Sequence, residues 1–82
     1  MVKKIEVQNS RNIASIEYDD ERLVMTIVFK NKKGNSKYEY YKVPSSMWDF
    51  MERYVQISGN SYGQWVRRYI SKKGAYEYKK IV

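Results

Sequence analysis

The chain contains no cysteine and no histidine, and it has a single proline. Without cysteine it forms no disulfide, no thiolate metal site and no thiol nucleophile. Without histidine it lacks the most frequent general base and metal ligand of proteins. No apolar run approaches the ~18 residues of a membrane span, and the N-terminus lacks the apolar core of a signal peptide. We therefore expect a soluble, cytoplasmic protein.

The remaining candidates for catalysis are carboxylates, serines, tyrosines and lysines. A glycine-rich phosphate loop is missing, and the acids gather in turns and on polar faces rather than in a paired site. Asp19, Asp20 and Glu21 adjoin one another, but the calcium-loop pattern is absent, which favours a solvated turn over a metal site. We expect no enzymatic activity, no catalytic residue, no metal and no cofactor.

Positive charge is in excess and is unevenly placed. Residues 1–52 hold nine Lys or Arg and eight Asp or Glu, whereas residues 53–82 hold seven Lys or Arg and one acid, Glu77. The balance is therefore +1 in the first part and +6 in the last 30 residues, which gives +7 for the chain. Such asymmetry favours an acidic partner, most often nucleic acid. A charge that serves only solubility is the alternative.

The stretch from Arg22 to Pro44 organises the chain. Its two β-rich runs flank the polar segment 31–36, a pattern that predicts an antiparallel hairpin with a loop longer than two residues. On the second run, Tyr38 and Tyr40 supply most of the packing. On the first run, one apolar face should meet the helices. That face consists of Leu23, Met25, Ile27 and Phe29.

Three further segments alternate in a way that is typical of strands. Residues 13–18 predict a third strand, with Ile16 and Tyr18 on one face and Ile13 on the other. Residues 2–8 are either a short strand or an extended lead-in. Residues 75–82 are either an edge strand or an extended tail docked by its tyrosines.

A first helix is predicted from about residue 47 to residue 57. Ser46 and Asp49 approximate a capping box at its start, and apolar residues at helical spacing predict a buried face. Either Gly59 or Asn60 suits a left-handed cap at its end.

A second helix is predicted to begin at Ser61, because Gln64 three residues later completes a capping box. Gly74 is predicted to end it, which places Lys72 and Lys73 near its C-terminus, where cations complement the macrodipole. The chain should thus form one α+β domain over residues 1–82. We expect a small antiparallel sheet of three main strands in the order β-β-β-α-α, with short terminal strands as an option and both helices on one face.

Four blocks of the sequence follow one another in a specific order. They are Ile13–Asp19, then Leu23–Phe29 with Tyr38-Glu39-Tyr40, then Val43–Met51, then Ser61-Tyr62-Gly63 continuing to Tyr76-Glu77-Tyr78. Over residues 7–81 their order and spacing resemble the KTSC domain, a module named after its place at the C-terminus of some lysyl-tRNA synthetases. The module also occurs alone in bacteria and phages. RNA binding has been suggested for the family, so the resemblance favours RNA as a partner.

Candidate nucleic-acid-binding residues lie in the last part of the chain. Clustered cations there could bridge phosphates, and tyrosines among them could stack on unpaired bases. Packing against the sheet is the alternative role of these tyrosines, and we favour it. The candidates are Arg67, Arg68, Lys72, Lys73, Lys79, Lys80, Tyr76 and Tyr78. We expect a non-enzymatic module that binds RNA or another single strand.

A protein-interaction module is the competing hypothesis. Trp48, Trp65 and Tyr62 would then serve as anchors of an accessory or inhibitor protein, because Trp, Tyr and Arg dominate interface hot spots. A weak homodimer through a free sheet edge, as opposed to a monomer, is a further option. The salt dependence of the binding affinity distinguishes these hypotheses. Phosphate binding weakens steeply with ionic strength, whereas binding through an aromatic-anchored interface depends on it much less.

Overall fold

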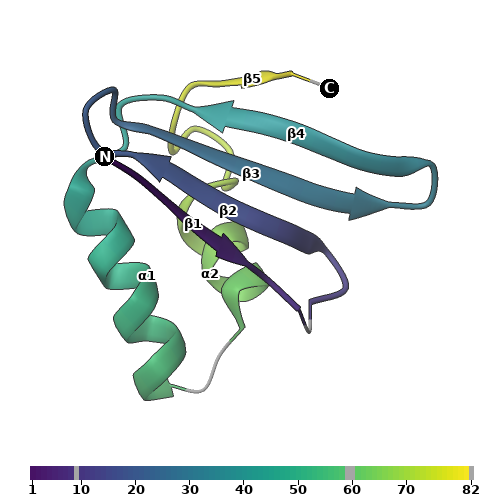
Figure 1. The fold of residues 1–82 in the computed structure, drawn as a ribbon, viewed down its shortest axis with the longest axis horizontal. Coiled ribbons are helices and arrows are strands. Elements are labelled where there is room, and N and C mark those ends of the chain that lie inside the picture. The colour runs from purple at the N-terminus through teal and green to yellow at the C-terminus, as the bar shows by residue number, and fades with distance from the viewer. Residues whose placement is uncertain (9, 59–60, 82) are drawn as a thin grey trace.

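A five-stranded antiparallel sheet and two helices form the domain (Figure 1). The computed structural model describes residues 1–8, 10–58 and 61–81. The elements are β1 (Val2–Glu6), β2 (Ile13–Asp19), β3 (Val24–Asn31), β4 (Gly34–Tyr40), α1 (Ser45–Ser58), α2 (Tyr62–Tyr69) and β5 (Tyr78–Lys80). The strands lie in the order β1-β2-β3-β4-β5, so β1 and β5 are the two edges.

The α+β class is confirmed, but the strand count and order differ from the prediction. Residues 2–6 pair with β2 along their whole length, from Val2 opposite Asp19 to Glu6 opposite Ser15, so they make a fourth main strand. After the helices, the short β5 pairs with β4, with Tyr78 opposite Tyr40. The order is therefore β-β-β-β-α-α-β, because both terminal segments satisfy their backbone groups in the sheet.

The hairpin of β3 and β4 is confirmed, whereas its predicted long loop is wrong. The strands pair as far as Asn31 opposite Gly34, so only Lys32 and Lys33 connect them. The side chain of Asn31 holds this tight turn: its Oδ1 accepts a hydrogen bond from the Lys33 N–H at 3.0 Å, and its Nδ2 donates to Ser36 Oγ at 2.8 Å. Gly34 adopts φ +124°, a conformation that side chains with a Cβ rarely take.

Replacing Gly34 by alanine is expected to lower the free energy of unfolding by about 1–2 kcal/mol, because a Cβ is strained at this φ. Gly63→Ala is the matched control. A Cβ on helical Gly63 would meet Ser10 Oγ at 3.5 Å, an ordinary contact, and alanine favours the helix. Urea unfolding should show Gly34→Ala less stable than wild type and Gly63→Ala at least as stable. Equal midpoints for the two variants would contradict the strained turn.

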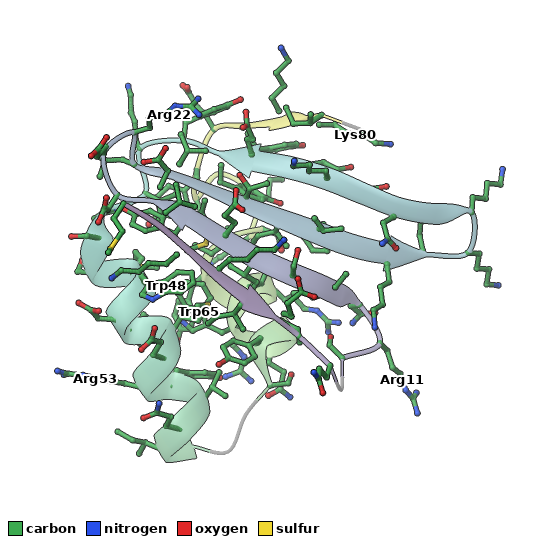
Figure 2. The ribbon with its side chains drawn as sticks, viewed as in Figure 1. Arg11, Arg22, Trp48, Arg53, Trp65 and Lys80 are labelled. Atoms are coloured by element: carbon green, nitrogen blue, oxygen red, sulfur yellow. The ribbon has the colours of Figure 1, made fainter. Side chains whose placement is uncertain are left out.

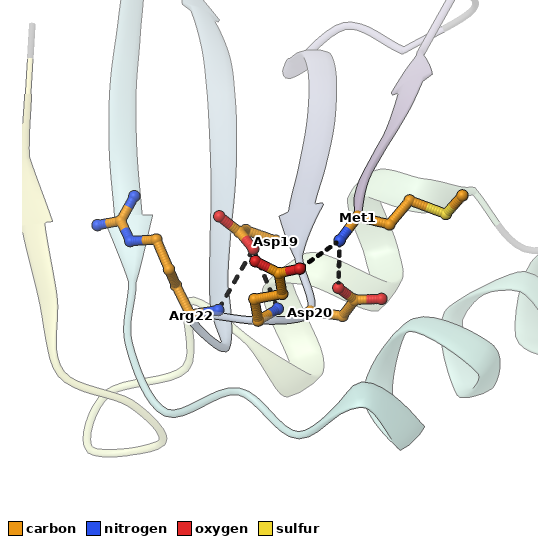
Figure 3. A network of polar contacts seen from close by, with 5 residues as sticks. Met1, Asp19, Asp20 and Arg22 are labelled. Carbon is orange, nitrogen blue, oxygen red and sulfur yellow. Dashed lines mark hydrogen bonds and ion pairs between the residues drawn. The ribbon is translucent and has the colours of Figure 1, made fainter.

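Two positions depart from the predicted strand alternation. The register of β2 and β3 shifts between Ile13 and Ser15, and this bulge turns Ile13 into the core, where 1% of it is exposed. Leu23 lies outside β3 with φ +57° and is 39% exposed, so the prediction that it joins the buried face is wrong. Leu23 follows a tight turn, in which Asp19 Oδ1 accepts hydrogen bonds from the N–H groups of Glu21 and Arg22 (Figure 3).

Helix α1 begins two residues earlier than predicted. Ser46 lies within its first turn, and the Met47 N–H already donates to the Pro44 carbonyl at 3.0 Å, so Ser46 does not occupy the predicted cap position. The predicted cap at Gly59 or Asn60 lies outside the described residues.

Helix α2 has the predicted start and a different end. Ser61 Oγ accepts a hydrogen bond from the Gln64 N–H at 3.2 Å, which confirms the N-cap. The helix ends at Tyr69 rather than at Gly74, because the N–H groups of Ile70 and Ser71 both donate to the Val66 carbonyl, at 2.9 and 2.8 Å. The chain therefore leaves the helix before Lys72 and Lys73, which lie in the turns that follow.

Both helices pack against the same face of the sheet around one core (Figure 1). Tyr18 stacks on Trp48 with ring centroids 6.1 Å apart, and its hydroxyl donates to the Val43 carbonyl at 2.6 Å. Trp48 and Trp65 are 3% and 0% exposed (Figure 2), so neither is available as the surface anchor that the protein-interaction hypothesis assigned to it. Among the described residues, the largest fully buried side chains are those of Ile13, Ile16, Tyr18, Met25, Ile27, Val43, Met51, Trp65, Val66 and Ile70.

Candidate nucleic-acid interface

Aromatic rings gather at the β4–β5 edge of the sheet, on the face that carries the helices. Alternation along β4 puts Tyr38 and Tyr40 on this face, and Tyr78 of β5 lies opposite Tyr40. The ring centroids of these three tyrosines lie 5.7–6.4 Å apart, and Phe29 of β3 meets Tyr38 edge-on at 5.6 Å. The four rings form one continuous aromatic layer.

Helix α2 ends before this layer, in which Tyr40 is buried, Phe29 and Tyr38 are half-buried and Tyr78 is exposed. The chain after the helix instead turns alongside it, and the space between them is a groove of about 570 Å³. We call it the tyrosine groove, lined by the four rings, by Tyr76 and by segment 70–74. Lys72 and Lys73 are exposed on the wall that this segment forms.

A second depression, of about 290 Å³, continues the tyrosine groove toward α2. It shares Phe29 and Ser71 with the groove and adds Lys30 and Arg67 to the surface. Lys30 Nζ donates to the Ser10 carbonyl at 3.1 Å, which holds this lysine against the bend before β2. The surface thus gains two cations at this end.

A third depression, of about 400 Å³, continues the groove toward the tip of the β3–β4 hairpin. It shares Asn31 and Ser36 with the tyrosine groove, and it is lined by three lysines. Two of them, Lys32 and Lys33, form the hairpin turn, and the third is Lys80. Lys80 lies opposite Tyr38 and therefore on the same face of the sheet.

The three depressions together carry charge of one sign. Their described lining residues include two cations in the tyrosine groove, two in the second depression and three in the third, and they include no Asp or Glu. We call these seven residues the basic surface: Lys30, Lys32, Lys33, Arg67, Lys72, Lys73 and Lys80. A concave surface lined by one sign of charge raises the local concentration of oppositely charged ligands.

The structure brings six of the eight predicted site residues together and separates two. Arg67, Lys72, Lys73, Lys80, Tyr76 and Tyr78 line the three depressions. Arg68 projects toward α1, where its Nη1 donates to the Tyr54 hydroxyl at 3.2 Å. Lys79 lies opposite Glu39 on the other face of the sheet.

The family model of the KTSC domain matches residues 9–78. The chain belongs to the KTSC domain family. It is also similar to the crystal structure of KTSC domain protein YPO2434 from Yersinia pestis, with 26% sequence identity, a TM-score of 0.66 and full coverage of both chains. No curated protein matches the sequence. Within the described ranges, no helix of this KTSC domain has the length and apolarity that crossing a bilayer requires.

The two Tyr-x-Tyr segments that carried the family resemblance meet in the tyrosine groove of this KTSC domain. Tyr38 and Tyr40 come from the first segment, and Tyr76 and Tyr78 from the second. The sequence did not reveal this meeting, because it required β5 to pair with β4 across the intervening helices. The spacing of Tyr38 and Tyr40, two residues apart and so on one face of a strand, was the available signal for half of the groove.

Three lysines of the basic surface were also missed. Lys30, Lys32 and Lys33 come from the part of the chain whose charges nearly balance. Their balancing acids include Asp19, Asp20 and Glu21, which lie at the opposite end of β3 from the hairpin tip. Counting charges along the sequence does not detect this separation, because the lysines and the acids move apart only when the strands pair.

Burial raises the pKa of Tyr40 to about 12, with smaller contributions from Tyr38 and Tyr78. Only 4% of Tyr40 is exposed, so the ionised phenolate would be poorly solvated. The hydroxyl therefore stays protonated throughout the physiological range. Tyr40 therefore adds no negative charge that would oppose an anionic ligand.

In the acidic turn of the KTSC domain, the carboxylates of Asp19 and Asp20 make local contacts (Figure 3). The Met1 ammonium donates to Asp20 Oδ1 at 2.8 Å, and this hydrogen bond lowers the pKa of the Asp20 carboxyl. The Asp19 carboxylate accepts the backbone bonds of the turn. In the parts of the chain that the structure describes, no three acidic side chains are placed to hold a metal ion.

Proposed function

We propose that this KTSC domain is a non-enzymatic module that binds single-stranded nucleic acid, RNA or DNA. The observation that supports the proposal is the grouping of seven cations and an aromatic floor in three adjoining depressions whose described lining contains no acid. Lysine and arginine bind phosphates, and tyrosine rings stack on bases. A strand that occupies this surface satisfies both kinds of group at once.

Unpaired strands fit this surface better than a duplex does. Sequence readout of duplex DNA places a protruding helix or strand pair into the major groove, whereas the candidate surface is hollow. The aromatic rings accept the faces of bases, and these faces are hidden by stacking in a duplex and available in loops and single strands.

A binding titration tests this function. The purified domain is mixed with labelled single-stranded RNA, single-stranded DNA and blunt duplex, at ~50 mM and ~200 mM salt. We expect the single strands to bind more tightly than the duplex, and to lose about 300-fold in affinity over this range if about six phosphates are contacted. No binding at the lower salt, or binding that salt does not weaken, would contradict the proposal.

A further inference from the structure

The rings of the tyrosine groove differ sharply in exposure. Tyr40 is 4% exposed and Tyr38 is half-buried, whereas Tyr78 is 62% exposed. No other Phe, Trp or Tyr of the described residues is exposed to this degree. Of the aromatic layer, Tyr78 is thus the ring whose surface is mostly open to a ligand.

Tyr78 is exposed but well positioned. Its ring centroid lies 5.9 Å from that of Tyr38 and 5.7 Å from that of Tyr40, so two rings support it from one side. Its backbone is paired with Tyr40 in the sheet. Two further backbone hydrogen bonds hold β5 to β4 at both of its ends: the Tyr41 N–H donates to the Glu77 carbonyl, and the Ile81 N–H donates to the Lys37 carbonyl. A ring that is already ordered loses little entropy when a ligand stacks on it.

Cations flank Tyr78 in two directions. Lys80 is two residues further along the same strand and on the same face, a separation of about 7 Å. Lys72 and Lys73 line the groove together with Tyr78, from the segment after α2. A nucleotide whose base lies on Tyr78 therefore has ammonium groups near the phosphates on either side of it.

We propose that the tyrosine groove binds one unpaired base, stacked on Tyr78, with the adjoining phosphates held by Lys72, Lys73 and Lys80. The inference rests on the proposed function and narrows it. Because one open ring accepts one base, the preferred ligand is a short unpaired segment, such as an overhang or a bulge. Longer strands should gain affinity only from further phosphate contacts.

The test uses a labelled duplex with a single-stranded overhang of about four nucleotides, the lower end of single-strand site sizes. An abasic nucleotide is placed at each overhang position in turn. For the wild-type domain we expect one position to dominate, with a loss of about tenfold when its base is missing. Tyr78→Leu should bind the intact overhang about tenfold more weakly and should no longer respond to the abasic position, while Tyr78→Trp should keep the response.

Tyr41→Leu is the matched control, because Tyr41 follows β4 and its hydroxyl donates to Glu39, away from the tyrosine groove. Thermal melts of all variants confirm that they are folded. If Tyr78→Leu binds like wild type, or if every abasic position weakens binding equally, the one-base site is wrong while salt-dependent binding of single strands still supports the proposed function. If wild type binds no oligonucleotide at ~50 mM salt, both proposals fail.

Discussion

Replacing Trp65 by alanine is expected to lower the free energy of unfolding by about 3–5 kcal/mol, a large fraction of the stability of the domain. Trp65 is fully buried and lies against Phe50 and Tyr69, with ring centroids 5.9 and 6.0 Å away. Removing a buried aromatic side chain costs about 3–5 kcal/mol, because transfer energy and a cavity add. A domain of 82 residues has roughly 4–12 kcal/mol of stability in total. Thermal and urea unfolding monitored by circular dichroism measure the loss.

Two variants make this result interpretable. Trp65→Phe keeps most of the apolar volume and removes an indole N–H for which the described residues show no hydrogen-bond partner, so its loss should be much smaller. Ile57→Ala changes a side chain that is 83% exposed and should leave the midpoint within error. A Trp65→Ala protein that melts close to wild type would mean that the core does not depend on this residue.

Charge reversal at Lys72 and Lys73 together is expected to lower the affinity for single strands by about 100-fold at low salt. Both lysines are exposed on the wall of the tyrosine groove, so the change removes two phosphate contacts and adds two repulsive carboxylates. The salt slope of binding should decrease at the same time. Because neither side chain is buried, the melting temperature should stay near that of wild type.

Arg53→Glu with Arg68→Glu is the control for this pair, since it changes the net charge by the same amount. Arg53 lies on α1, well away from Lys80 (Figure 2), and Arg68 projects toward the same helix, where it contacts Tyr54. Long-range effects between exposed charges are screened beyond a Debye length, so the control should lose only a few-fold. Equal losses for both pairs would show that net charge, and not the basic surface, determines binding.

Local features of the fold were predictable from the sequence. The β3–β4 pairing follows from alternation, and the start of α2 follows from Ser61 and Gln64, whose hydrogen bond closes within one turn. The features that were missed depend on geometry that side-chain patterns do not encode. The bulge before Ser15 reverses the face of Ile13, and two converging N–H groups on the Val66 carbonyl end α2 early.

The candidate site was predictable only in part for the same reason. The excess of charge after residue 53 identified the cations of α2, of the following turns and of β5. The segment after the end of α2 forms one wall of the tyrosine groove, whereas the sequence predicted that this segment is helical. Pairing of β5 with β4 then joins two distant segments, and no local pattern specifies that contact.

The two edge strands of the sheet bear on whether copies of the domain associate with one another. An edge strand offers unpaired backbone groups to any other strand, and lysines on it oppose such pairing. β1 carries Lys3 and Lys4, and β5 carries Lys79 and Lys80. Each edge that a second copy could approach therefore carries two lysines. The lysines that we propose bind a polyanion are thus also expected to oppose pairing between the edge strands of two copies. This opposition should weaken where salt or a bound polyanion neutralises the charges.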